Sequence, residues 1–199
     1  YFYQIPEEAR GKTVSFVFSA KSSNGETVKY PMGPYRITNM DIVRNLKLQD
    51  GGACYISIAD STVYDSAGAA AHPDKIDLVY LYRKLTGVNF GNALVSPAAD
   101  PQYLGGITLP AGVNADTRIE QVWNLQDQDL AQLQYGIFID DVDFQKLDLT
   151  GQPDYTINLK QESGAWVETH DGTYRAYIFF NSVDNAGHAV ISMKRYKMK

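Results

Sequence analysis

The sequence predicts a mainly β protein of the α+β class, built from β-sandwich-like sheets with two or three short helices. Three observations lead to this prediction. Apolar residues recur at every second position in many segments, which is the period of a half-buried strand. Turn sequences such as Asn24-Gly25 and Asp171-Gly172 separate these segments. Residues with helical spacing are confined to short stretches.

The first 37 residues predict strands and no helix. Apolar side chains occupy every second position of Val14–Phe18, and the Asn24-Gly25 turn leads into a returning strand at Thr27–Tyr30. With the apolar start of the chain this makes three strands, too few to enclose a core of their own. The residues expected to interrupt the returning strand are Pro31, Gly33 and Pro34.

The segment Tyr3–Gly25 carries a first resemblance. It reads Tyr-x-x-Pro, a short loop, Gly-Lys-Thr-Val-Ser-Phe-x-Phe-Ser-Ala, and a loop with Asn-Gly. This pattern resembles the last three strands of bacterial immunoglobulin-like surface modules. The resemblance implies that residues 1–38 are a partial immunoglobulin-like β segment whose earlier strands are missing here. Residues 39–199 are then expected to form a β-rich domain of unknown function.

A hairpin is expected directly after this segment. Apolar residues at even positions of Met40–Leu48 indicate one strand, and Asp50-Gly51-Gly52 indicates a turn. The returning strand would run through Cys54. Since the chain has one cysteine, Cys54 can form no internal disulfide, and we expect it to be a small buried apolar residue.

The middle of the chain predicts a helix, two strands and a long loop. The Ala-rich stretch Ser66–His72 favours a short helix, which Pro73 ends. Ile76–Arg83 is apolar at odd and even positions, which indicates a central strand buried on both faces. Phe90–Val95 predicts a weaker strand. Ser96–Asp116 shows neither period, and loops of this length are usually functional.

The last third predicts helices first and strands after them. The sequence Thr117-Arg118-Ile119-Glu120 has the form of a capping box and predicts the start of a helix. A second short helix is expected at Asp127–Tyr135. Four strands follow, of which the last two should form a terminal hairpin: Tyr155–Lys160, Ala165–His170, Thr173–Asn181 and His188–Tyr196.

Composition excludes several classes of function. The chain has 199 residues, 18 Lys plus Arg against 23 Asp plus Glu, and a formal net charge of -5. An acidic chain without a basic stripe is not expected to bind nucleic acid. The longest apolar runs are five residues, far below the roughly 20 that a membrane-spanning helix needs. Three His and one Cys exclude dense metal or disulfide frameworks.

Four apolar segments carry a second resemblance. They are Cys54–Ile58, Lys75–Arg83, Tyr174–Phe179 and Ile191–Tyr196. They resemble an uncharacterised family of secreted or lipid-anchored surface proteins of Bacteroidetes. The resemblance implies an extracellular or cell-envelope protein of gut bacteria, with any lipid anchor upstream of this chain. It implies no activity, ligand or catalytic residue.

One acidic cluster suggests a metal site. Asp140, Asp141 and Asp143 follow Ile139, and a strand here would place Asp141 and Asp143 on one face, where they could hold Ca²⁺. The alternative is that these carboxylates face water or cap the next turn, since the Asp-x-Asp-x-Asp-Gly calcium loop is absent. No other cofactor is expected.

The sequence holds no specific catalytic signature. The Gly-x-Ser-x-Gly and His-Glu-x-x-His motifs are absent, and the three His residues lie far apart in the sequence. Two carboxylates about 5 to 10 Å apart could serve a glycoside hydrolase, but 23 acidic residues supply such a pair by chance. A carbohydrate-active hydrolase is therefore kept as an alternative, and we expect no enzyme.

Aromatic residues suggest the ligand. The chain has 14 Tyr, 8 Phe and 2 Trp, and flat rings can stack on sugars. Trp166 with Glu168 beside it, and Trp123 after the long loop, are the candidate binding residues; the alternative is that they are ordinary strand and core residues. The leading expectation is a non-catalytic binding or adhesion module for polysaccharide, and a structural scaffold for a surface-protein partner is the remaining alternative.

Overall fold

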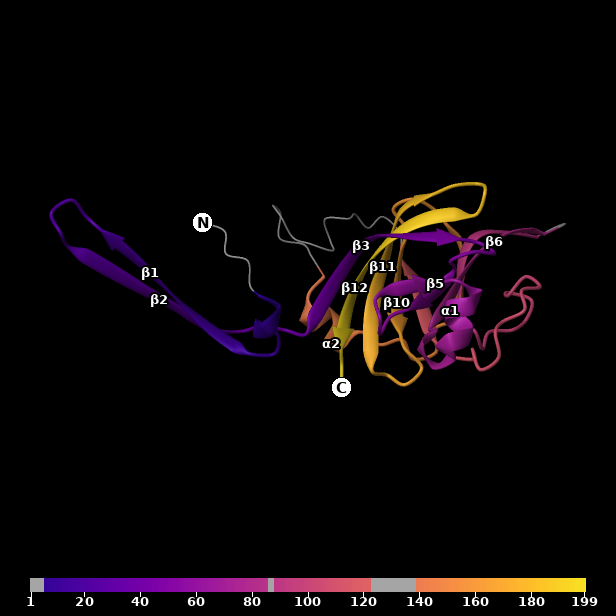
Figure 1. The fold of residues 1–199 in the computed structure, drawn as a ribbon, viewed down its shortest axis with the longest axis horizontal. Helices are drawn as coiled ribbons and strands as arrows, with labels where there is room; N and C mark the ends of the chain where they lie inside the picture. Colours follow the sequence, from indigo (N-terminus) through magenta and orange to yellow (C-terminus); the bar gives the residue numbers. More distant parts are fainter. Residues whose placement is uncertain (1–5, 86–87, 123–138) are drawn as a thin grey trace. The chain divides into compact units, whose positions relative to one another are not determined.

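The computed structural model describes residues 6–85, 88–122 and 139–199. The chain forms two units, Tyr1–Met40 and Asp41–Lys199. Both are built mainly from strands, which are antiparallel, with short helices between them (Figure 1). The fold class expected from the sequence is therefore confirmed.

The first unit is a two-stranded hairpin. Its strands are β1 (Thr13–Lys21) and β2 (Thr27–Arg36), paired antiparallel with Phe18 opposite Tyr30. The strand continues to Arg36, but its pairing with β1 shifts register at Gly33 and Pro34, so the expected interruption takes the form of an irregularity within one strand. Among the described residues β2 pairs on one side only, so a proline without an N–H costs no ladder bond on its open edge.

A short 3₁₀ helix, η1 (Glu7–Ala9), precedes the hairpin, although the sequence predicts no helix here. It is a single turn, in which the Ala9 N–H donates to the Pro6 carbonyl at 3.0 Å. The fixed φ of proline favours such a turn. The strand expected at the start of the chain lies outside the described residues.

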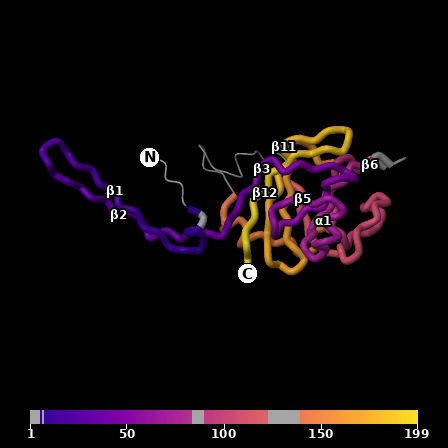
Figure 2. The backbone as a smooth tube through the Cα atoms, viewed as in Figure 1, coloured from indigo at the N-terminus to yellow at the C-terminus, as the bar shows by residue number. Residues whose placement is uncertain are grey.

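The second unit contains two five-stranded sheets in the part of the chain that the structure describes. The β11 sheet has the strand order β3-β12-β11-β10-β8, and the β6 sheet has the order β5-β4-β6-β7-β9. Figure 2 shows β3 running beside β12 from the other end of the chain. The strands of the β11 sheet are β3 (Met40–Gln49), β8 (Arg118–Val122), β10 (Gly164–Glu168), β11 (Tyr174–Val183) and β12 (His188–Lys197). Those of the β6 sheet are β4 (Tyr55–Ser57), β5 (Thr62–Tyr64), β6 (Leu78–Leu85), β7 (Val88–Val95) and β9 (Tyr155–Leu159).

The core lies between the two sheets. The rings of Tyr80 on β6 and Phe180 on β11 are both fully buried, with their centroids 6.5 Å apart. The pleat of β6 directs Val79 and Leu81 to the opposite face, and they too are fully buried. The prediction of a central strand buried on both faces is confirmed. The helix expected before Pro73 is confirmed as α1 (Ser66–Ala71).

Two other predictions are confirmed in this unit. The terminal hairpin is formed by β11 and β12, with Phe179 opposite Ser192. Cys54 is 1% exposed, and burial raises the pKa of its thiol to about 11, so it is an inert apolar residue.

The hairpin expected after Met40 is wrong, because β3 and β4 belong to different sheets. The chain turns at Asp50-Gly51-Gly52, where the Gln49 N–H donates to the Ala53 carbonyl at 2.9 Å, and then crosses to the β6 sheet. Asp50 holds this crossing in place. Its carboxylate accepts the Tyr82 N–H at 3.0 Å and forms an ion pair with Arg83, so the turn is tied to β6.

The helix expected from the capping box is also wrong, because Arg118–Val122 is strand β8. Ile119 pairs with Val167 of β10 and is fully buried, while its neighbours are partly exposed. The Thr117 N–H donates to Ser96 Oγ at 2.8 Å. Pairing with β10 therefore overrides a local capping signal that has low specificity.

Two further predictions fall on residues outside the described ranges. They are the candidate binding residue Trp123 and the helix Asp127–Tyr135. In the described ranges, no helix has the length and apolar character needed to cross a bilayer.

Candidate functional site

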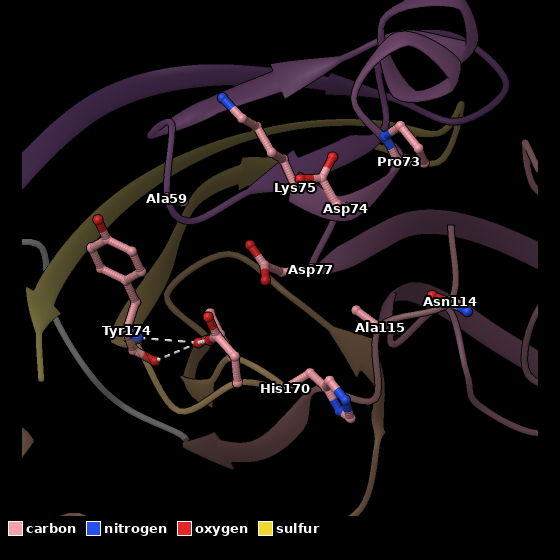
Figure 3. A pocket seen from close by; sticks show the side chains of 11 residues that line it. Ala59, Pro73, Asp74, Lys75, Asp77, Asn114, Ala115, His170 and Tyr174 are labelled. Atoms are coloured by element: carbon pink, nitrogen blue, oxygen red, sulfur yellow. Dashed lines mark hydrogen bonds between the residues drawn. The ribbon is translucent and has the colours of Figure 1, made fainter. Parts of the chain in front are cut away.

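A pocket of about 430 Å³ opens at one end of the two sheets, and we call it the end pocket. The β4–β5 turn, the 3₁₀ helix η2 (Pro73–Lys75), the loop before β8 and the β10–β11 turn form its walls (Figure 3). Its lining residues are Ala59, Pro73, Asp74, Lys75, Asp77, Asn114, Ala115, Thr169, His170, Asp171 and Tyr174. Connections from both sheets therefore meet at one cavity with several polar side chains in its lining.

Asp77 is the buried carboxyl group of the end pocket. Its side chain points into the pocket in Figure 3, and the residue is 9% exposed. Its Oδ2 accepts the Ile58 N–H at 2.7 Å, so the same group holds the β4–β5 turn. Burial raises the pKa of Asp77 to about 7, and the charges of Asp171 and Asp60 act in the same direction. At neutral pH the group is partly protonated and can donate or accept a hydrogen bond.

The β10–β11 turn supplies a second carboxyl group with the opposite shift. Thr169 Oγ1 donates to Asp171 Oδ1 at 2.7 Å, and the Thr173 N–H donates to the same oxygen at 2.9 Å. Burial acts to raise the pKa of Asp171, but hydrogen bonds from Thr173 and Thr169 outweigh it and lower the pKa. Asp171 is therefore ionised at neutral pH, in the same pocket as the partly protonated Asp77.

Arg195 on β12 fixes one wall of the end pocket. Its Nη1 donates to the carbonyls of Ile58, at 2.8 Å, and of Ala59, and its Nη2 lies 3.0 Å from Asp41 Oδ2 in an ion pair. Its guanidinium carbon also lies 5.2 Å from the centroid of the Tyr174 ring. These contacts tie the β11 sheet to the β4–β5 turn, which preorganises the wall.

The opposite wall is held by Ser96. Its Oγ donates to the Ala115 carbonyl at 2.6 Å and accepts the Thr117 N–H at 2.8 Å. The loop that carries Asn114 is therefore anchored directly after that residue. Asn114 and His170 are exposed side chains that line the pocket, where a ligand can reach them.

Trp166 and Glu168, the described residues of the expected aromatic platform, do not line the end pocket. Both are half-buried on β10. The Trp166 ring meets Phe144 edge-on, with centroids 5.4 Å apart, and lies 5.1 Å from the Tyr177 ring. Glu168 Oε2 accepts from Arg175 Nε at 2.6 Å in an ion pair. Packing and pairing therefore engage both side chains, and their part in ligand binding stays a prediction.

The expected calcium ligands Asp141 and Asp143 lie in a helix, α2 (Asp141–Lys146), and not in a strand. The Asp140 side chain accepts the Asp143 N–H, and Asp143 Oδ2 accepts the Asp140 N–H at 2.8 Å, which makes a capping box. The strand prediction is wrong because capping satisfies the first N–H groups of this helix. In the described part of the chain, no group of three or more His, Cys, Asp or Glu side chains could hold a metal ion.

Sequence reasoning missed the residues that form the end pocket. One signal was present: Asp77 stands between Ile76 and Leu78 in an apolar run, and a buried acid often marks a functional position. Asn114 and His170 gave no comparable signal. They lie on separate connections, and only the fold brings them together.

Comparisons with known proteins identify families without a stated activity. The family described as a domain of unknown function (DUF8576) matches residues 38–198, and the domain of unknown function DUF4466 matches residues 1–37. The crystal structure of a DUF4466 family protein from Parabacteroides merdae is similar to this chain, with 41% identity and a TM-score of 0.84. The match covers 98% of this chain and 66% of that chain, so this chain spans less than two thirds of the relative. No curated protein matches.

Proposed function

We propose that this chain, which belongs to the family described as a domain of unknown function (DUF8576), is a non-catalytic module that binds polysaccharide. The observation that carries the proposal is the end pocket. Its volume of about 430 Å³ lies within the roughly 300 to 1,000 Å³ of small-molecule sites, and its walls are preformed. Its place at one end of the sheets suits the end or a branch of a sugar chain.

The chemistry of the end pocket matches sugar hydroxyl groups, each of which can donate and accept a hydrogen bond. The ionised Asp171 offers acceptors, and the amide of Asn114 offers both kinds of partner. Asp77 adds a group that can take either role near neutral pH. A ligand that presents several hydroxyls can therefore satisfy several of these groups at once.

We also propose that the protein acts in the cell envelope or outside the cell. Two observations support this: the sequence resembles secreted or lipid-anchored surface proteins of Bacteroidetes, and the solved relative comes from Parabacteroides merdae, a member of that group. Cell fractionation and protease treatment of intact cells test the location. Protection from external protease together with recovery in the cytoplasmic fraction would contradict it.

The binding test uses a variant confined to exposed groups of the end pocket. We expect the double variant Asn114→Ala/His170→Ala to bind at least tenfold more weakly to a polysaccharide that wild type binds, a loss of about 1.4 kcal/mol. Isothermal titration calorimetry against plant, mucin and microbial polysaccharides measures this. Gln145→Ala, an exposed residue of α2 outside the pocket, is the control and should bind like wild type.

Two results would contradict the binding proposal. One is that the double variant binds with wild-type affinity while a folded Trp166→Ala variant no longer binds. This result would place the site at the aromatic residues on β10. The other is the absence of binding across the panel, which would favour a scaffold with a protein partner.

A hydrolase is the second candidate, and the pKa pattern of the end pocket favours it. Two carboxyl groups in one pocket, one with a raised pKa and one with a lowered pKa, are the arrangement that glycosidases use for acid and base. The binding proposal expects no release of reducing ends from the same panel. Release that Asp77→Asn abolishes in a folded protein would replace binding by catalysis.

A further inference from the structure

A second pocket, of about 300 Å³, lies at the other end of the two sheets. β11 begins with Tyr174 at the end pocket and finishes with Val183, which lines this second pocket. We call it the asparagine pocket, because Asn92, Asn158 and Asn185 line it. Its residues are distinct from those of the end pocket.

The backbone is irregular where the asparagine pocket forms. Gly91 on β7 and Asn158 on β9 both have left-handed conformations, with φ of +56° and +57°. A Cβ placed on Gly91 would lie 3.5 Å from Asn158 Oδ1, so the two residues face each other. The pairing of β7 with β9 also shifts register beside them, between Asn92 and Leu94. Such bulges re-aim side chains and are common next to binding sites.

Asn92 forms the buried side of the pocket. It is 6% exposed, and its Oδ1 accepts a hydrogen bond from the Tyr80 hydroxyl at 2.5 Å. This bond fixes the orientation of the amide, with its oxygen toward the Tyr80 hydroxyl and its Nδ2 donor at the opposite end. The amides of Asn158 and Asn185 are exposed, and each offers a donor and an acceptor.

One cation lines the asparagine pocket. Lys160, an exposed side chain, is the charged residue among those that line it. The nearest acid along the chain from Asn185 is Asp184. Its carboxylate accepts the N–H groups of Ala186 and His188, both at 2.8 Å, and lies 2.8 Å from the His188 ring. These hydrogen bonds keep Asp184 ionised and hold its carboxylate at Ala186 and His188, so Lys160 is the cation that the pocket lining offers to an anionic group.

We propose that the asparagine pocket is a second binding site, for a sugar unit that carries an anionic group. Lys160 pairs with the anionic group, and the three amides bind neighbouring hydroxyls. The end pocket is lined by Asp74, Asp77 and Asp171 against one cation, Lys75, so its acids outnumber its cations and disfavour the same anion. This site depends on residues separate from the end pocket and can fail while the proposed function holds.

The test compares an acidic sugar with its neutral form. We expect wild type to bind trigalacturonate at least tenfold more tightly than its methyl ester, and a sulfated galactose oligosaccharide of similar length at least tenfold more tightly than the unsulfated one. Lys160→Gln should abolish the preference, because the substituted amide keeps hydrogen bonding and loses the charge. Calorimetry at low and moderate salt measures the affinities, and thermal melts confirm folding.

Matched variants separate the two sites. Asn185→Ala should weaken binding of the acid and of the ester alike, whereas the end-pocket variant Asn114→Ala/His170→Ala should leave the preference for the acid unchanged. Three outcomes would overturn the proposal: equal binding of acid and ester by wild type, a preference that survives Lys160→Gln, or no binding of either anionic probe. If the end-pocket variant loses binding to neutral polysaccharide while the Lys160 and Asn185 variants keep it, the proposed function holds whichever of these outcomes is found.

Discussion

The two ends of the sandwich form their pockets in different ways. At the end pocket, side chains hold the walls in place: Asp77 and Arg195 form hydrogen bonds to the backbone of the β4–β5 turn. At the asparagine pocket, the backbone itself is bent by the left-handed Gly91 and Asn158 and by a register shift. One core can therefore support two sites whose stability depends on different things. The first should respond to pH and charge, and the second to backbone conformation.

The largest expected effect is a pH dependence that comes from Asp77. Its pKa is raised from 3.8 to about 7 in the folded protein, so its contribution to stability is complete below pH 4. As the pH rises from about 4 to 7, the unfolded chain ionises this group and the folded protein resists doing so. The free energy of unfolding should fall by roughly 4 kcal/mol over this window.

Asp77→Asn isolates this effect. The substituted amide cannot ionise and can still accept the Ile58 N–H. Urea unfolding of both proteins at several pH values gives the difference between their free energies of unfolding. Carboxyl groups with lowered pKa values, such as Asp171 and Asp184, contribute equally to both proteins, so their pH dependence cancels in this difference. The free energy of unfolding of the variant should increase relative to that of wild type as the pH rises to about 7. A difference that does not change with pH would mean that Asp77 is not desolvated.

The second effect concerns the wall of the end pocket. Arg195→Ala should destabilise the protein by about 2 to 3 kcal/mol, because it removes an ion pair with Asp41 and hydrogen bonds to the carbonyls of Ile58 and Ala59. The same substitution should also lower the affinity of the end pocket for its ligand, and it should leave the preference of the asparagine pocket for acidic sugars unchanged.

Arg195→Lys and Lys197→Ala are the controls for this prediction. The lysine keeps the charge but loses the planar fork, so it should recover part of the stability. Lys197 is exposed on the same strand, and its removal should cost less than 0.5 kcal/mol. Urea unfolding measures all three variants. Equal losses at both pockets would show that Arg195 supports the whole sandwich and not one end.

The sequence predicts elements well where a strand pattern is long. Ile76–Arg83 is apolar on both faces and is the central strand β6, and the terminal hairpin is signalled by alternation on both sides of a turn. Pairing is harder to predict. Alternation in β3 predicts one buried face, which Leu48 confirms and the exposed Ile42 does not, and it gives no sign that the partner strand is β12 at the far end of the chain. The capping box before β8 fails for a related reason, because a distant strand decides the conformation.

The candidate sites were less predictable than the fold. The end pocket joins Asp77, Asn114 and His170 from three connections, and no spacing in the sequence brings them together. Residue type and the neighbouring Glu168 on the same expected strand point to Trp166 as a binding residue, and the structure packs it against Phe144 and Tyr177. The left-handed Asn158 gives no signal in sequence either, because asparagine is also an ordinary residue of turns.

The smallest expected effect tests the backbone of the asparagine pocket. Asn158 has a φ of +57°, where asparagine is tolerated, glycine is free of strain and alanine is strained. Asn158→Ala should therefore cost about 1 kcal/mol, while Asn158→Gly should leave stability within about 0.5 kcal/mol of wild type. Urea unfolding separates the two, and Asn185→Ala, which changes a pocket residue with no positive φ, should match wild type. If the alanine and glycine variants are equally stable, the left-handed conformation of Asn158 carries no strain. The end pocket and the asparagine pocket would then differ only in the charges that line them.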